Sequence, residues 1–371
     1  THANGETLAP RSCDTRAYCH TGLAALGELR PDVEPRATHN ITQMQEMIAQ
    51  LVANGHAYVA EGHVLFSVGS FPSYGALSGR NPDELEAGAR VEVAPYKQAA
   101  GDFVLWKPST PDQPGWDSPW GRGRPGWHIE CSAMSHRYLG DSFDIHGGGS
   151  DLMFPHHENE RAQSLCCFPH GSFATYWVHN AMLLVDGEKM SKSLGNFLTI
   201  RDVLAQAPAE ALRLLPLGAH YRSTLTYTQA GLNEARKTLD RFYRALSSVT
   251  DIPEAPVPQT VRAALEEDLN TPKAIAELHV LANQAMGGDR DAAGALRAGG
   301  RLLGLLQDDP QLWFKGGASG EEDAAMEGLM AERLAAKKAR DFARADALRD
   351  QLQAQGIVLE DTKDGTSWRR A

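Results

Sequence analysis

The sequence has no hydrophobic run long enough to cross a membrane. Its 371 residues contain no apolar stretch that approaches the roughly 20 residues needed to span a bilayer. The opening residues, THANGETLAPRSC, carry neither the basic segment nor the apolar segment of a secretory leader. We therefore expect a protein without membrane association.

Cysteine is scarce and irregularly placed. An odd number of cysteines at uneven spacing in a long chain argues against a disulfide framework and for a reducing compartment, so we expect a cytoplasmic location. The five cysteines are Cys13, Cys19, Cys131, Cys166 and Cys167.

Positive charge is also in deficit. The chain has 36 lysines and arginines against 47 aspartates and glutamates, a formal net charge of −11. This balance repels a polyanion at long range, so contact with nucleic acid needs a local basic patch. Residues 331–371 contain 9 basic and 7 acidic residues, a net of +2, which suits a tail that touches RNA.

Apolar periodicity divides the chain into three parts. A spacing of 3, 4 and 3 from Ile41 to Leu51 predicts a helix that ends at Gly55. Residues 57–68 read as a hairpin around Glu61-Gly62, and residues 174–185 as a strand. The predicted order is an α/β part, an all-α part and a small mixed module.

The later parts are mostly helical. A clear stripe runs from Leu232 to Leu246, and Pro216 should kink or interrupt an earlier helix. Residues 314–323 look like a linker. A last helix has the apolar stripe Phe342, Ala345, Leu348 and Leu352.

A glycine triplet opens the first stretch that carries chemistry, DIHGGGSDLMFPHHENE. Gly147, Gly148 and Gly149 allow a backbone to approach a ligand closely and to adopt positive φ. Asp151 is placed to accept hydrogen bonds from hydroxyl groups such as those of a ribose. The alternative is a tight loop between a strand and a helix.

A candidate metal site overlaps this stretch. His156 and Glu160 are four residues apart, and Pro155 before them suits the first position of a helix, so both side chains would share one face. Such a pair alone is usually a solvated surface pair. Cys131, in GWHIECSAM, is the candidate third ligand, and a thiolate would favour zinc over magnesium or calcium. The alternative for Cys131 is a small buried apolar residue.

Two lysines stand in a loop of glycine and serine, VDGEKMSKSLGN. The ammonium groups of Lys189 and Lys192 suit a phosphate chain, and glycines allow the loop to close on a ligand. The alternative is a solvated hairpin tip.

Together these motifs resemble one family. KMSKS, residues 189–193, resembles the signature loop of class I aminoacyl-tRNA synthetases. Residues 123–134 and 143–164 look like cysteinyl-tRNA synthetases, and residues 356–370 resemble the end of the bacterial members. The resemblance covers essentially all 371 residues.

The resemblance implies a reaction and its partners. Cysteine and ATP, the latter with Mg²⁺, would form cysteinyl-adenylate, and the cysteine would pass to the 3′-terminal adenosine of its tRNA. It implies one zinc ion per chain, which binds the substrate thiolate, and a monomer. A soft metal suits the task, because a hydrophobic pocket separates isosteres by only about 10²-fold.

The resemblance also assigns roles to residues. Cys131, His156 and Glu160 match three of four zinc ligands, and Trp127 and His128 match the wall around the cysteine side chain. Lys192 matches the ATP-binding lysine; with Lys189 it would neutralise charge on the phosphates, while the glycine triplet and Asp151 would complete the ATP site. In the tail, Trp368, Arg369 and Arg370 would stack on and pair with an unstacked base, unless they form an ordinary solvated terminus.

The implied architecture has four segments. A Rossmann-type catalytic domain would occupy residues 1–177, with an insertion at about 54–119. A stem-contact segment with the lysine loop would follow at 178–225, then a tRNA-binding helical bundle at 226–318. An anticodon-contacting module would occupy 322–371.

The sequence departs from the family pattern at its beginning. The His-Ile-Gly-His signature and the fourth zinc ligand, a cysteine before it, are not found in the 371 residues. We therefore expect an N-terminally truncated chain that lacks the first segment of its catalytic domain, binds zinc weakly and charges tRNA at trace level or not at all. The other cysteines, Cys13, Cys19, Cys166 and Cys167, do not match ligand positions and should be structural.

Two other functions stay open. A related ligase gives activated cysteine to an amino sugar in mycothiol synthesis, but it has no need of an anticodon-reading tail. The missing signature also leaves room for a non-catalytic, RNA-binding fragment.

Overall fold

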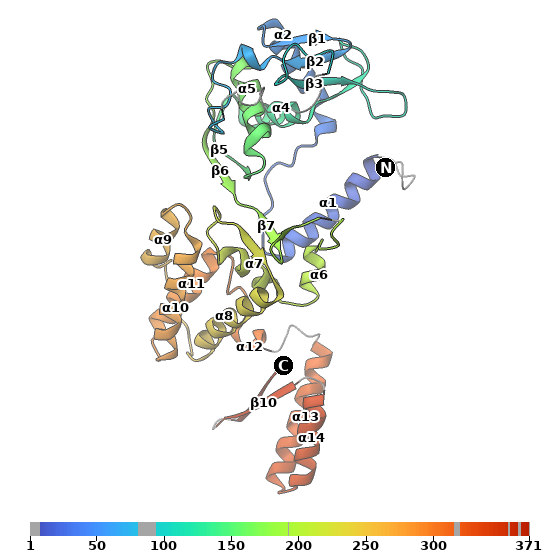
Figure 1. Cartoon of the computed structure of the whole chain (residues 1–371). Coiled ribbons are helices and arrows are strands. Elements are labelled where there is room, and N and C mark those ends of the chain that lie inside the picture. Colours follow the sequence, from blue (N-terminus) through green and yellow to red (C-terminus); the bar gives the residue numbers. More distant parts are fainter. Residues whose placement is uncertain are drawn as a thin grey trace. The chain divides into compact units, whose positions relative to one another are not determined.

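The computed structural model describes the backbone of residues 8–80, 94–191, 193–314, 320–354, 357–362 and 365–370. Side chains are described for residues 15–80, 94–191, 193–314 and 328–354. The chain forms two compact units (Figure 1). The α/β unit comprises Arg30–Met182 and Arg222–Thr224, and the helical unit comprises Thr1–Leu29, Leu183–Tyr221 and Leu225–Ala371.

The α/β unit contains two sheets. An antiparallel sheet has the order β1-β2-β3-β4, and β5 pairs with β6 in parallel, joined through α5 as a βαβ unit. The elements are η2 (Ala37–His39), α2 (Ile41–Ala53), β1 (Ala57–Ala60), β2 (His63–Phe66), η3 (Val68–Ser70), β3 (Phe103–Pro108), β4 (Gly123–Pro125), α4 (Trp127–Leu139), β5 (Ser142–Gly149), η4 (Met153–His157), α5 (Glu158–Cys167) and β6 (Phe173–Asn180).

The core of this unit lies between its helices and the first sheet. Figure 1 shows α2, α4 and α5 packed together beside the β1–β4 sheet. The predicted helix and hairpin are confirmed: Met44, Ile48 and Leu51 of α2 are fully buried, and Glu61 and Gly62 both have the positive φ that a tight hairpin requires. Because α4 and α5 share this core, their first turns are held near each other.

The helical unit is built around α8. Its elements are α1 (Leu8–Ala25), β7 (Leu183–Val185), β8 (Glu188–Lys189), α6 (Ile200–Leu204), α7 (Ala209–Leu217), β9 (Leu225–Tyr227), α8 (Gln229–Ser247), α9 (Gln259–Glu266), α10 (Thr271–Met286), α11 (Arg290–Leu302), α12 (Pro310–Trp313), α13 (Gly320–Lys338), α14 (Phe342–Ala354), β10 (Ile357–Thr362) and β11 (Gly365–Arg370). The strands form the sheet β8-β7-β9 and the hairpin β10-β11.

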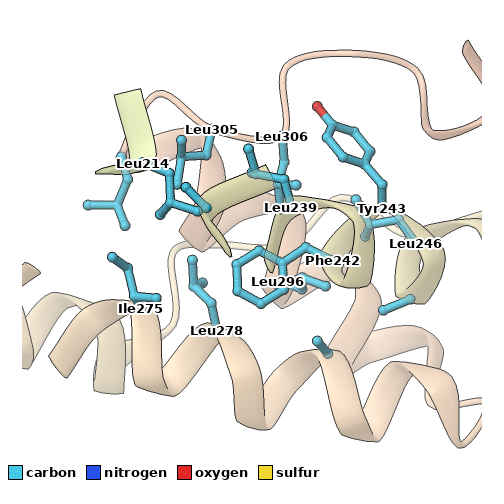
Figure 2. Packing of buried hydrophobic residues seen from close by; sticks show 14 of the residues in the cluster. Leu214, Leu239, Phe242, Tyr243, Leu246, Ile275, Leu278, Leu296, Leu305 and Leu306 are labelled. Carbon is cyan, nitrogen blue, oxygen red and sulfur yellow. The ribbon is translucent and has the colours of Figure 1, made fainter. Parts of the chain in front are cut away.

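The predicted stripe on α8 is confirmed as the centre of the helical core. Leu239, Phe242 and Leu246 are buried against Leu278 and Leu296 from α10 and α11 (Figure 2). Thr228 begins α8 by accepting a hydrogen bond from the Gly231 amide at 2.9 Å. Among the described residues, none of the helices has the length and apolar character of a membrane span.

Three expectations need refinement. Pro216 lies in the last turn of α7, so it coincides with the end of that helix. The linker prediction extended too far, because α13 already begins at Gly320; residues 315–319 lie outside the described residues. The last predicted apolar stripe is confirmed at Ala345, Leu348 and Leu352, which are buried. It is wrong at Phe342, in the first turn of α14, because that side chain is 63% exposed.

Candidate active site

The first side of the site is the beginning of α4. Gly126 precedes the helix and leaves room for a carbonyl, since a Cβ there would lie 2.0 Å from the Val104 oxygen. The close approach fixes where the helix starts. Trp127, His128 and Cys131 then fall on its first two turns.

The second side is the turn that leads into α5. Phe154 is extended, with φ −139° and ψ 131°, and helical geometry begins at Pro155, as predicted. The segment Met153–His157 is therefore kinked at Phe154 rather than one regular helical turn. It carries His156 and His157, and Glu160 lies in the first turn of α5.

The predicted trio converges. Each of Cys131, His156 and Glu160 offers one ligand atom, and these three atoms lie within 4.8 Å of one another. His156 Nε2 lies 2.5 Å from Glu160 Oε1, and both side chains are almost completely buried. The pair is therefore part of the interior rather than a solvated surface pair, and the role of the trio as metal ligands stays a prediction.

Three further histidines belong to the same cluster, and the sequence motifs did not single them out. His146 Nε2 lies 2.9 Å from Glu160 Oε2, and His146, His157 and Glu160 form a second group with metal-ligand spacing. His157 Nδ1 lies 2.8 Å from His179 Nε2. The sequence carries a sign of this cluster in its composition, because seven of the 14 histidines lie between residues 128 and 179.

The electrostatics of the cluster favour an ionised Glu160 carboxylate and neutral rings at His128 and His157. Burial by itself raises the pKa of Glu160, but hydrogen bonds from His146 and His156 outweigh it and bring the pKa to about 2. Burial lowers the pKa of His128 and of His157 to about 4. Burial, with the carboxylates of Glu160 and Glu130, raises the pKa of the Cys131 thiol to about 12.

The donor set fits a soft divalent cation. A thiol, an imidazole and a carboxylate are all zinc ligands, and a half-buried thiol whose pKa is raised to about 12 needs a nearby cation to ionise near neutral pH. His128 Nδ1 lies 2.7 Å from His156 Nδ1, so the His156 ring has a partner on each nitrogen. Such outer contacts hold the rings of metal-ligating histidines in place.

Trp127 lies beside this cluster, and its role as a wall around the cysteine side chain stays a prediction. Its ring stacks on that of His156, with centroids 4.4 Å apart and planes 25° apart, while the side chain stays 59% exposed. An exposed aromatic side chain over buried donors leaves an apolar surface accessible from solvent. The arrangement is compatible with a substrate side chain that packs on Trp127 and His128.

The glycine triplet behaves differently from expectation. Gly147, Gly148 and Gly149 are the last residues of β5, and none of these described residues has positive φ, so that part of the prediction is wrong. A Cβ on Gly148 would lie 2.9 Å from the His157 ring, and one on Gly149 would lie 2.4 Å from Asp151 Oδ1. The missing side chains therefore make room for the histidine cluster and for Asp151, which is itself exposed.

The remaining predicted residues lie in the helical unit. Lys189 is exposed at the end of β8. Lys192 lies outside the described residues. Trp368, Arg369 and Arg370 belong to β11, and their side chains lie outside the described ones.

Comparisons with known proteins agree with this architecture. Residues 4–237 match the family described as tRNA synthetases class I (C) catalytic domain, residues 260–307 match the DALR domain, and residues 319–369 match the cysteinyl-tRNA ligase anticodon binding domain. The methionyl-tRNA synthetase of Mycobacterium tuberculosis, solved with methionyl-adenylate, has a similar fold. That similarity has a TM-score of 0.53 at 12% identity and covers 84% of this chain and 79% of that one.

The fold is thus that of a class I aminoacyl-tRNA synthetase, with a Rossmann-like catalytic part followed by helices. Two relatives narrow it further. The cysteine–tRNA ligase of Gluconobacter oxydans is 66% identical over 99% of this chain and 81% of its own length, and that of Rhodospirillum rubrum is 60% identical over 100% and 83%. The chain belongs to the family of bacterial cysteinyl-tRNA synthetases.

Proposed function

We propose that the chain attaches L-cysteine to its cognate tRNA at the expense of ATP, at the trace level expected without the His-Ile-Gly-His signature, and that Cys131, His156 and Glu160 hold a zinc ion that selects the cysteine thiol. The proposal rests on one observation, the convergence of a thiol, an imidazole and a carboxylate within 4.8 Å. The names of the relatives supply the substrate: the proteins from G. oxydans and R. rubrum are both cysteine–tRNA ligases.

Selection against serine is the main chemical demand on this site. Cysteine and serine differ by one atom, and an apolar pocket separates such isosteres by only about 10²-fold. A bound zinc ion would supply the distinction, because a thiolate is a far better soft ligand than a neutral hydroxyl.

The residues of the chain would prepare that site before substrate arrives. Glu160, ionised because of its two histidine contacts, provides the negative charge that a cation needs. The contact of His128 with His156 restrains the ring orientation of His156. Trp127, stacked on His156, offers the apolar wall against which the Cβ of the substrate packs.

The chemical step would need positioning and charge stabilisation rather than covalent help. A carboxylate oxygen of cysteine attacks the α-phosphorus of ATP, pyrophosphate leaves, and cysteinyl-adenylate forms. Lys189 and Lys192 would neutralise charge on the phosphates, and Gly147–Gly149 with Asp151 would receive the nucleoside. A hydroxyl of the 3′-terminal adenosine of the tRNA then takes the cysteinyl group, and AMP leaves.

Binding of unreactive analogues tests the proposal directly. Cysteinyl-sulfamoyl-adenosine and its seryl counterpart are titrated calorimetrically into the zinc-loaded chain. We expect the cysteinyl analogue to bind more tightly than the seryl analogue by well over the factor of about 10² that an apolar pocket alone supplies. In Cys131→Ser, both zinc and this preference should be lost, whereas Cys19→Ser, at an exposed position on α1, should keep both. Equal affinity for the two analogues, or a Cys131→Ser chain that retains stoichiometric zinc, would reject the proposal.

A further inference from the structure

The loop that carries the lysine pair is closed by a side chain of its own. It begins at Lys189, the last residue of β8, and runs to Thr199 before α6. Asn196 lies near its far end, one residue after Gly195, whose φ of 69° turns the chain back. The two arms of the loop are therefore directed toward each other.

Asn196 bridges the two arms through both ends of its amide. Its Oδ1 accepts a hydrogen bond from the Ser191 backbone N–H at 2.8 Å. Its Nδ2 donates to the backbone carbonyl oxygen of Lys189 at 3.3 Å. Because it needs a donor and an acceptor on one short side chain, the bridge suits asparagine: aspartate lacks the donor, and alanine lacks both.

The far arm of the loop is itself anchored. Thr199 and Asp202 form a capping box at the start of α6, in which the Thr199 amide donates to Asp202 Oδ2 at 3.0 Å and the Asp202 amide to Thr199 Oγ1 at 3.2 Å. Ser191 Oγ accepts from the Leu194 amide at 3.2 Å, which tightens the turn between the arms. Asn196 thus links a fixed helix start to the backbone at Lys189.

We propose that Asn196 is a positioning residue that holds the backbone at Lys189 and Ser191, so that the lysine ammonium meets the phosphates of ATP from a restrained loop. This inference rests on the proposed role of Lys189 toward ATP. A loop that contains a glycine has many conformations to lose when a ligand binds, and a loop ordered in advance has fewer. Asn196 therefore acts on ATP only through the loop that it closes.

The test combines amide hydrogen exchange with titration of Mg·ATP into the whole chain. In Asn196→Ala we expect the Ser191 and Leu194 amides to exchange roughly tenfold faster, and the dissociation constant of Mg·ATP to rise roughly three- to tenfold, the range for losing one or two hydrogen bonds. Asn196→Asp retains an acceptor for the Ser191 amide, so that amide should stay protected. Asn233→Ala, an exposed position on α8, is the matched control.

A double-mutant cycle separates positioning from simple destabilisation. If Asn196 acts through Lys189, the double variant Asn196→Ala/Lys189→Ala should bind Mg·ATP about as weakly as Lys189→Ala alone. The inference would be overturned if the two substitutions lowered the affinity for Mg·ATP additively, or if amide hydrogen exchange were unchanged in Asn196→Ala. If Lys189→Ala and Lys192→Ala both bind Mg·ATP as tightly as the unmodified chain, the proposed phosphate role of the loop is wrong, and exchange alone decides whether Asn196 orders it.

Discussion

His146 Nε2 lies 2.9 Å from Glu160 Oε2, on the carboxylate oxygen opposite the one that faces His156. His146 comes from β5 and Glu160 from α5, so the contact joins the strand to the helix of the βαβ unit. With one oxygen directed at each imidazole, the carboxylate plane has little freedom to rotate. The orientation of Glu160 toward a cation is therefore set partly by a residue that is not in the predicted ligand trio.

Removing this restraint should weaken zinc binding without abolishing it. In His146→Ala we expect the affinity for zinc to fall about 10- to 100-fold, the usual effect of deleting an outer contact to a metal ligand. Competition with a chromophoric chelator measures it. His136→Ala, a surface histidine paired with Asp141 at 3.0 Å, is the control and should bind zinc normally. Unchanged affinity in His146→Ala would show that Glu160 is oriented by its other neighbours.

Local features of the fold were readable from the sequence. The helix from Ile41 was encoded by apolar spacing, and the hairpin by the dipeptide Glu61-Gly62, whose residues both adopt positive φ. The spacing of His156 and Glu160 likewise placed them together, because residues four apart meet on a helix. In each case the determining interaction lies within a few residues along the chain.

The histidine cluster was not readable in the same way. His146 and His179 meet the others because β5 and β6 pair in parallel, and His157 follows the kink at Phe154. Neither long-range strand pairing nor a backbone kink leaves a periodic signal in one sequence. The sequence suggests positive φ for the glycine triplet, but its role in the structure is steric. Without a side chain, Gly148 leaves room for the His157 ring. Spacing alone cannot separate these two uses of glycine.

The metal-free chain should lose stability as the pH falls. Burial lowers the pKa of His157 to about 4, whereas an exposed histidine titrates near 6.5. Below a pH of about 6.5 this histidine is protonated in the unfolded chain but still neutral in the folded chain. The free energy of unfolding therefore falls until the pH reaches about 4. Thermal unfolding in chelator between pH 7.5 and 5 measures this. In His157→Gln the decrease of stability with falling pH should be smaller. An equally steep decrease in that variant would show that other groups cause the loss of stability.

The tail should contribute salt-dependent affinity for tRNA. Replacing both Arg369 and Arg370 by alanine should reduce the slope of log affinity against log salt by about 1 to 2, because each lost phosphate contact removes roughly 0.7 to 0.9. Filter binding of cysteine tRNA at several salt concentrations measures it. The variant with lysine at both positions keeps the charge and should keep the slope. Identical slopes in all three proteins would place the basic contact elsewhere.

The second lysine of the loop should matter for ATP and not for cysteine. Lys192 lies outside the described residues, so this prediction rests on its motif. In a chain that carries the His-Ile-Gly-His signature, Lys192→Ala should lower cysteine-dependent ATP–pyrophosphate exchange about 10²- to 10³-fold, the usual effect of removing one preorganised group that stabilises developing charge. Cysteine binding measured without ATP should change little, since the proposed ligands of the thiol site belong to the α/β unit and the lysine belongs to the helical unit.

The control for that experiment replaces a lysine that lies outside the loop, so that the same charge is removed at another place. Lys237→Ala removes an exposed ammonium on α8 that pairs with Glu234 at 2.7 Å, and it should leave exchange unchanged. If Lys192→Ala exchanges at the rate of the unmodified chain, Lys192 does not hold the phosphates. A loss shared equally by both variants would instead indicate a general dependence on net charge, because a specific contact at the loop cannot be reproduced from α8.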